Sequence, residues 1–156
     1  MEDLLHYLSV FFCSMVPIIE LRGAIPMGAA LGISWPVNFA ICIVGNMLPI
    51  PFILLFIRHI LAWMKTTKRL SRIALWLEEK AAQKSARVMK YATFGLTVFV
   101  GIPLPGTGAW TGALVAALLN MRMKYALPSI FAGVLLAAFI MSGISYGFLS
   151  FLDFLA

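Results

Sequence analysis

The chain of 156 residues is 62% hydrophobic and only 12% charged, with a mean hydropathy of +0.98. A soluble domain carries about 25% charged residues, so the composition excludes an ordinary soluble domain and predicts an all-α integral membrane protein of one domain. The net charge of +6 does not indicate binding to nucleic acid, because the basic residues gather between two apolar regions, where they set membrane topology.

The first predicted unit, residues 1–58, combines a re-entrant helical hairpin over 4–33 with a transmembrane helix over 36–57. The apolar run at its start, residues 4–19, is 16 residues long, shorter than the roughly 20 that a helix needs to span hydrocarbon. The run ends in ELRGAIPMGAALG, where charges, glycines and a proline predict unwound backbone at the tip of the hairpin. No basic residue precedes Arg22, so no cleavable signal peptide is expected.

The predicted transmembrane helix over 36–57 carries Gly45, Asn46, Pro49 and Pro51, which indicate a kink near its middle. Asn46 lies among apolar neighbours, where an amide more often bonds to a neighbouring helix than to a ligand. Asn46 is therefore a candidate binding residue, with bonding to a neighbouring helix as the more common role of such an amide.

A basic linker over residues 59–90 separates the two units. Residues 58–90 hold nine of the twelve basic residues and only two acids, so the positive-inside rule predicts that this loop is cytoplasmic. Apolar and small residues on one helical stripe predict an amphipathic helix at the inner membrane surface (Leu70, Ile73, Ala74, Leu77, Ala81, Ser85 and Val88). A solvated connector is the alternative, because several of these positions are only Ala or Ser.

The second predicted unit, residues 91–156, combines a re-entrant hairpin over 91–121 with a transmembrane helix over 126–152. The apolar tract of this hairpin is 31 residues long, is broken by GIPLPGTGAWTGA, and is followed by the basic residues Arg122 and Lys124. A single crossing would place these two charges outside, against the positive-inside rule. A tract that enters the membrane and turns back at the break keeps both of its ends in the cytoplasm, and this arrangement puts both chain termini outside.

The two halves also share short sequence matches. Gly28-Ala29 repeats at Gly112-Ala113, and the pattern Pro36-x-x-Phe39-Ala40 repeats at Pro128-x-x-Phe131-Ala132. Together with the opposite predicted orientations of the halves, these matches predict an inverted repeat, in which the site of a transporter lies where the repeats meet.

Glu20 and Arg22 are the charged candidates for a site. An ionisable side chain inside the membrane costs roughly 2.5–3.5 kcal/mol on insertion scales and is functional by default; anchoring at a shallow interface is the alternative. At a two-residue spacing the pair cannot meet on a regular helix. The two side chains can meet in an unwound hairpin tip or across to the other repeat, and Gly23 and Pro26, which follow at once, favour the unwound tip. Glu20 is the candidate proton or cation carrier, since low dielectric favours the neutral form of a carboxyl group, and Arg22 is the candidate ligand of an anionic group.

The remaining candidate binding residues come from both hairpin tips. They are Gly23 and Pro26 in the first tip and Pro103, Pro105, Gly106, Thr107, Gly108, Trp110, Thr111 and Gly112 in the second. The second tip offers hydroxyl groups, an aromatic wall and the amides of a helix N-terminus, which attract anions. Tight helix packing through Gly108 and Gly112 is a competing and compatible interpretation.

The motifs ELRGAIPMGAALG and PLPGTGAWTGA resemble the small multi-drug export protein family of prokaryotic membranes, and the resemblance covers essentially the whole chain. That family in turn resembles the DedA-like (VTT) superfamily, which is described with inverted repeats of a re-entrant hairpin and a transmembrane helix. The resemblance implies the cytoplasmic (inner) membrane of a prokaryote, site positions at both motifs, and proton-linked transport. The second motif departs from the DedA-like pattern because its tip, residues 106–108, lacks an arginine.

The sequence therefore predicts a small secondary transporter, flippase or exporter, coupled to protons, that moves a small amphiphile, an anionic solute or a lipid headgroup. A non-transporting membrane scaffold or accessory subunit is the alternative. The sequence has no nucleophile–base set, metal-ligand cluster or nucleotide-binding loop, so we expect no enzyme activity, no metal and no cofactor. A chain of 156 residues forms a thin barrier around a site, which is compatible with a homodimer in the bilayer.

Overall fold

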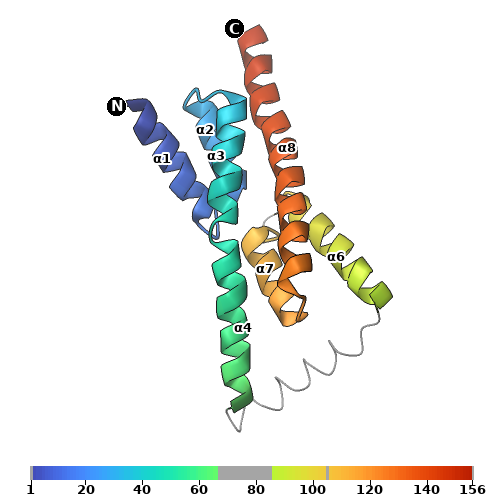
Figure 1. Cartoon of the computed structure of the whole chain (residues 1–156). Coiled ribbons are helices and arrows are strands. Elements are labelled where there is room, and N and C mark those ends of the chain that lie inside the picture. Colours follow the sequence, from blue (N-terminus) through green and yellow to red (C-terminus); the bar gives the residue numbers. More distant parts are fainter. Residues whose placement is uncertain (1, 67–85, 105, 156) are drawn as a thin grey trace.

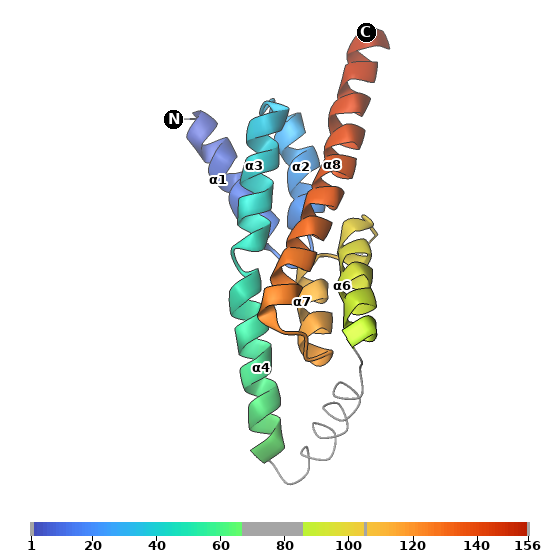
Figure 2. The same ribbon diagram turned by 45° about the vertical axis from the view of Figure 1, so that its right-hand side comes forward.

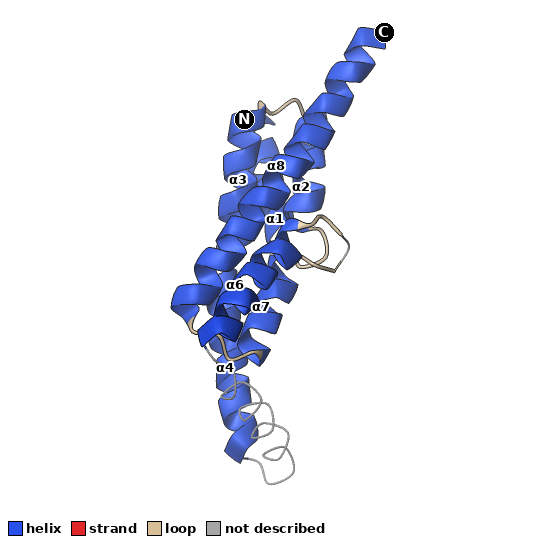
Figure 3. Ribbon diagram, turned by 90° about the vertical axis from the view of Figure 1, so that its right-hand side faces the viewer, coloured by secondary structure: helices blue, strands red, loops and turns tan. Residues whose placement is uncertain are grey.

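The computed structural model describes residues 2–66, 86–104 and 106–155, and every regular element among them is a helix (Figure 3). The helices are α1 (Glu2–Met15), α2 (Glu20–Ala30), α3 (Trp35–Met47), α4 (Ile50–Thr66), α6 (Ala86–Gly101), α7 (Ala109–Leu118) and α8 (Met123–Leu155). Most of the amphipathic stripe predicted for the linker, from Leu70 to Ser85, and the candidate residue Pro105 lie outside the described residues.

Both halves of the chain follow the same order of elements. A helix leads to a short break, a second helix, a tight turn and a long apolar helix: α1, α2 and α3–α4 in the first half, and α6, α7 and α8 in the second. The breaks lie at residues 16–19 and 102–108. Figure 1 and Figure 2 show the α1–α2 hairpin and the α6–α7 hairpin entering from opposite ends of the molecule, with their tips meeting near its middle.

The first break lies earlier in the chain than the sequence predicts. The four candidate residues of the first motif all belong to a helix, α2 (Glu20, Arg22, Gly23 and Pro26). The chain reverses before them, at residues 16–19, where Pro17 donates no backbone hydrogen bond. Glu20 then starts α2 with a left-handed φ of 51°. The expectation of an unwound ELRGAIP segment is therefore wrong, because the chain reverses over residues 16–19 and Glu20, the first residue of the segment, already belongs to α2.

Similar turns end α2 and α7. Gly32 has a φ of 75° and Asn120 a φ of 50°, and the amide after each bonds back to the carbonyl five residues earlier, at 3.0 and 2.9 Å. A left-handed residue with this bond closes a helix as a Schellman turn. Asn120 follows Gly32 by 88 positions (120 − 32), and α8 starts 88 positions after α3 (123 − 35). The two sequence matches, at offsets of 84 (112 − 28) and 92 (128 − 36), therefore do not align structurally equivalent residues.

The long helix α8 lies at the centre of the packing and contacts α6, α7, α2 and α3. Gly133 lets α6 approach closely, since a Cβ at this position would lie 2.7 Å from the Thr97 carbonyl and from the side chain of Val100. In contrast to α8, which contacts several helices, α4 packs mainly against α7. It leaves Phe52 and Phe56 exposed.

Among the described residues, two helical segments are long and apolar enough to cross a membrane: Trp35–Ile60 and Met123–Phe148, each of 26 residues. Only 33% and 39% of their most apolar windows are buried, unlike a core helix of a soluble protein, which is buried all round. The first segment has the predicted kink, because α3 ends at Met47 and α4 begins at Ile50. Its second helix, α4, continues beyond the predicted end at residue 57.

Candidate functional site

Glu20 lies buried where the two hairpin tips meet. Its side chain is 4% exposed, and its Oε1 accepts a hydrogen bond from the backbone amide of Trp110 at 3.2 Å. Gly108, the N-cap residue of α7, leaves room for the carboxylate, because a Cβ at this position would overlap both of its oxygens. The carboxylate therefore lies on the N-terminus of α7, where free amides and the helix dipole favour a negative charge.

Arg22 binds the other side of the same break. Its guanidinium donates to the carbonyl of Leu104, to the carbonyls of Ile102 (3.2 Å) and Val100 (3.4 Å), and to Oγ1 of Thr107 (2.9 Å). These carbonyls belong to the last turn of α6 and to the loop that follows it, where helical partners are missing and the dipole favours a positive charge.

Trp110, on α7, bonds to the first hairpin through its side chain. Its indole Nε1 donates to the carbonyl of Met15, the last residue of α1, at 3.1 Å. Within the described residues Glu20 and Arg22 do not form an ion pair with each other; each one instead compensates one end of the α6–α7 break. The two broken hairpins thus satisfy each other's helix ends, and this reciprocal contact is the junction between the two halves.

A cavity of about 390 Å³ lies against this junction. Its lining includes seven of the predicted site residues, Glu20, Arg22, Gly23, Pro103, Gly106, Gly108 and Thr111. Gly106 turns the loop with a φ of 85°, which glycine adopts without strain. Two further predicted residues, Thr107 and Trp110, bond directly to the charged pair. The structure therefore brings most of the predicted site together.

Three predicted site residues lie apart from the cavity. Gly112 faces the side chain of Val100 on α6, so it serves helix packing. Pro26 lies inside α2. Asn46 is fully buried in α3, and neither polar atom of its side-chain amide has a hydrogen-bond partner in the part of the chain that the structure describes. An unpartnered buried amide costs about 1–3 kcal/mol.

The sequence reasoning missed a polar cluster around Asn38. Its Nδ2 donates to the carbonyl of Ile25 at 2.8 Å and to Oη of Tyr146 at 2.9 Å, and the Tyr146 hydroxyl donates to the carbonyl of Ile33 at 2.7 Å. Gly28 makes room, since a Cβ there would overlap the Asn38 amide. The cluster ties α3 to α2 and α8. A second asparagine in an apolar helix was the available signal for it.

Arg58 lies inside α4, eight residues before the end of that helix at Thr66 (66 − 58). Its Nη2 donates to the carbonyl of Met121, in the turn that ends α7. The exposed residue Arg122 follows at once. The bond therefore holds α4 beside the start of the second long helix, where Arg58 and Arg122 supply one basic residue from each half.

A family match covers residues 20–140, from Glu20 through both hairpin-tip motifs and into α8. No curated protein and no solved structure matches the chain. The family description together with the two long apolar helices indicates a membrane protein of transport type. Because the match spans most of the chain, the protein belongs to the family described as "Putative small multi-drug export protein".

Proposed function

We propose that this chain is a proton-coupled membrane exporter of amphiphilic molecules and that Glu20 is its proton-carrying group. The observation that carries the proposal is the position of Glu20, which is 4% exposed, lies where the two hairpin tips meet, and is held by backbone amides of α7. An ionisable side chain at such depth is costly in a membrane and is functional by default.

The junction gives protonation of Glu20 a mechanical effect. The ionised carboxylate completes the N-terminus of α7, whereas a neutral carboxyl loses its attraction to the helix dipole and accepts weaker hydrogen bonds. The left-handed backbone of Glu20 stores strain of about 1–3 kcal/mol, and it relaxes more easily once this cap is weakened. Protonation then loosens the contact between the hairpins, and the bond from Trp110 to Met15 loosens with it.

The proposed topology is an inverted repeat with the basic end in the cytoplasm. Its support is the shared order of elements in both halves and the entry of the two hairpins from opposite ends (Figure 1). The positive-inside rule assigns the end that carries Arg58 and Arg122 to the cytoplasm. Both chain termini lie at the other end of the molecule (Figure 1), which the topology places outside. The relation to DedA-like proteins stays a prediction.

Proteoliposomes that contain a trapped pH-sensitive dye test this function. A gradient of dodecanesulfonate, which stays charged and carries no proton by itself, should drive proton movement through the wild-type protein. Glu20→Gln should abolish this movement, because glutamine still accepts the Trp110 hydrogen bond but cannot take up and release a proton. Asp3→Asn, which neutralises an exposed carboxylate in α1, is the matched control and should transport normally. Equal proton movement in wild type and Glu20→Gln would overturn the proposal.

The alternative function, a membrane scaffold or accessory subunit, has one observation in its favour. Every hydrogen bond given above for Glu20 and Arg22 is to the second hairpin of the same chain, as a purely structural pair would require. A scaffold predicts that a folded Glu20→Gln protein keeps the cellular phenotype of the wild type. The exporter predicts that the same folded variant loses it.

A further inference from the structure

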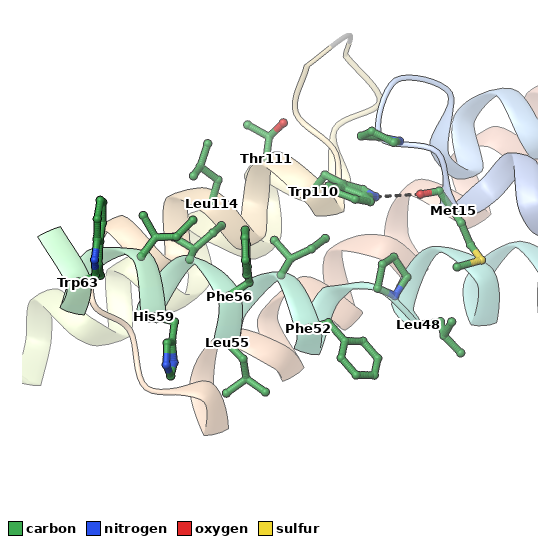
Figure 4. A pocket seen from close by; sticks show the side chains of 15 residues that line it. Met15, Leu48, Phe52, Leu55, Phe56, His59, Trp63, Trp110, Thr111 and Leu114 are labelled. Carbon is green, nitrogen blue, oxygen red and sulfur yellow. Dashed lines mark hydrogen bonds between the residues drawn. The ribbon is translucent and has the colours of Figure 1, made fainter.

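A long apolar groove lies between α4 and α7 (Figure 4). Its volume is about 1210 Å³, larger than the 300–1,000 Å³ typical of small-molecule pockets. Figure 4 shows Trp110 and Met15 at one end of the groove and His59 and Trp63 at the other. The groove therefore connects the junction between the hairpins with the basic end of the molecule.

The groove is long enough to hold an alkyl chain through one leaflet of a bilayer. The positions on its α4 side run from Leu48 to Trp63. These 15 steps (63 − 48) correspond to about 22 Å at a helical rise of 1.5 Å per residue. Half of the hydrocarbon thickness of a bilayer is about 15 Å. A chain that enters at the Trp63 end thus reaches the hairpin tips.

The chemistry of the lining changes along this length. Apolar side chains such as Phe52, Phe56 and Leu114 form most of the walls, and His59 is the one titratable group among the lining residues that the structure describes. It lies at the outer end, and the preceding residue, Arg58, does not line the groove and donates to the Met121 carbonyl. Apart from Glu20, the acidic residues of the described helices are in the terminal turns of α1 and α8, at the opposite end of the molecule (Figure 1). The outer end of the groove therefore favours a negatively charged head group.

The inner end of the groove touches the junction. Pro17 and Thr111 line both the groove and the smaller cavity at the hairpin tips. Trp110 contributes to the groove wall, while its backbone amide bonds to Glu20 at 3.2 Å and its indole to Met15 at 3.1 Å. A molecule that presses on Trp110 thus acts on the residue that holds Glu20.

We propose that the α4–α7 groove binds a single-chain anionic amphiphile, with its head group at the His59 end and the end of its tail against Trp110. The inference rests on the proposed function, because it names the substrate class of the exporter. It also assigns Trp110 as the positioning residue through which a bound tail affects Glu20.

Quenching of tryptophan fluorescence by dibromostearate tests the binding. One protein keeps only Trp110 and a matched protein keeps only Trp35, which is 51% exposed on α3 and does not line the groove. Trp110 should show saturable quenching that unlabelled stearate reverses, whereas Trp35 should show only the weak, linear quenching of membrane partition. Quenching of Trp110 that is as weak and linear as that of Trp35 would overturn the inference.

A second pair of variants tests the location. Leu114→Phe adds bulk inside the groove at a half-exposed position, and Leu118→Phe adds the same bulk at a similarly exposed position on α7 that does not line it. We expect Leu114→Phe to weaken dibromostearate binding about tenfold, the scale of one misplaced group in an apolar pocket, and Leu118→Phe to leave it unchanged. Equal affinities of the two variants would place the ligand elsewhere.

Ligands that share one alkyl chain but differ in head group test the charge preference of the groove. Dibromostearate should bind more tightly than its methyl ester and than the corresponding alkylammonium, and His59→Asp should remove this preference. Tighter binding of the ammonium compound would overturn the assigned head-group chemistry.

These binding experiments are independent of transport. Glu20→Gln should bind dibromostearate while it fails to move protons, because Glu20 does not line the groove and glutamine still accepts the Trp110 hydrogen bond. Wild-type protein that moves protons but does not bind dibromostearate would overturn the groove assignment alone. Wild-type protein that binds dibromostearate but moves no protons would overturn the proposed function alone.

Discussion

We expect Gly108→Ala to destabilise the protein. The cause is a steric clash at the junction between the hairpins, and not backbone strain. Gly108 has φ −74° and ψ −170°, angles that alanine adopts freely. The added Cβ, however, would occupy the space of the Glu20 carboxylate. The carboxylate must then leave the N-terminus of α7, and its hydrogen bond to the Trp110 amide breaks.

The expected loss follows from the interactions that break. A hydrogen bond to a charged group contributes about 1.5–3 kcal/mol, and the helix dipole adds about 0.3–1 kcal/mol. We therefore expect Gly108→Ala to lower the free energy of unfolding by about 2–4 kcal/mol. The matched control is Gly143→Ala in α8, where a Cβ would meet open space; in a helix interior this change should stabilise by about 0.5–1 kcal/mol.

Unfolding in mixed micelles, titrated with a denaturing detergent and followed by circular dichroism, measures both variants. If Gly108→Ala is as stable as Gly143→Ala, the carboxylate does not occupy the position on α7 from which the proposed mechanism starts. In a Glu20→Gly background, which lacks both the overlapping side chain and its hydrogen bond, adding Gly108→Ala should cost little if the clash with the carboxylate causes the loss.

Other parts of the structure predict further outcomes. Arg22→Lys keeps the charge but loses the planar guanidinium that binds several carbonyls, so detergent unfolding should show a free energy of unfolding that is lower by about 1–3 kcal/mol. An unchanged free energy of unfolding would refute the role of the guanidinium. Asn46→Leu should raise the unfolding midpoint, because it removes a buried amide without a partner, and a lower midpoint would reveal a partner such as bound water. Asn120→Gly should be nearly neutral in the same titration, whereas Asn120→Val should cost about 1–2 kcal/mol because of the left-handed backbone; equal effects would refute the importance of that turn. Impermeant thiol reagents should label a cysteine at Asp3 from outside and one at Met123 from inside, and labelling of both from one side would refute the inverted topology.

The position of the first break shows where the sequence is ambiguous. Pro17, Gly23 and Pro26 all weaken a helix, and local propensity does not say which of them marks the reversal. In the folded protein α2 packs along α1, α3 and α8, and these contacts keep Gly23 and Pro26 helical despite their poor propensity. Tertiary packing therefore selected Pro17, at the cost of a left-handed Glu20.

The roles of the charged residues show a similar limit. The sequence identifies Glu20 and Arg22 as exceptional because charge is rare in an apolar chain. It also predicts that helix N-terminal amides in the second tip attract an anion. The anion that the structure places there is the Glu20 carboxylate of the first hairpin, 90 positions before its partner Trp110 (110 − 20). No local pattern specifies a contact over this separation.

By itself the sequence determined the helical class, the second break and the kink between α3 and α4, because each depends on local properties. These properties are the length of an apolar run, the missing amide of proline and the backbone freedom of glycine. The tertiary structure alone decided that Glu20 and Arg22 bind opposite ends of the α6–α7 break instead of each other. The reason is physical: a broken helix exposes a positive and a negative end, and only the folded arrangement brings a side chain of the opposite charge to each.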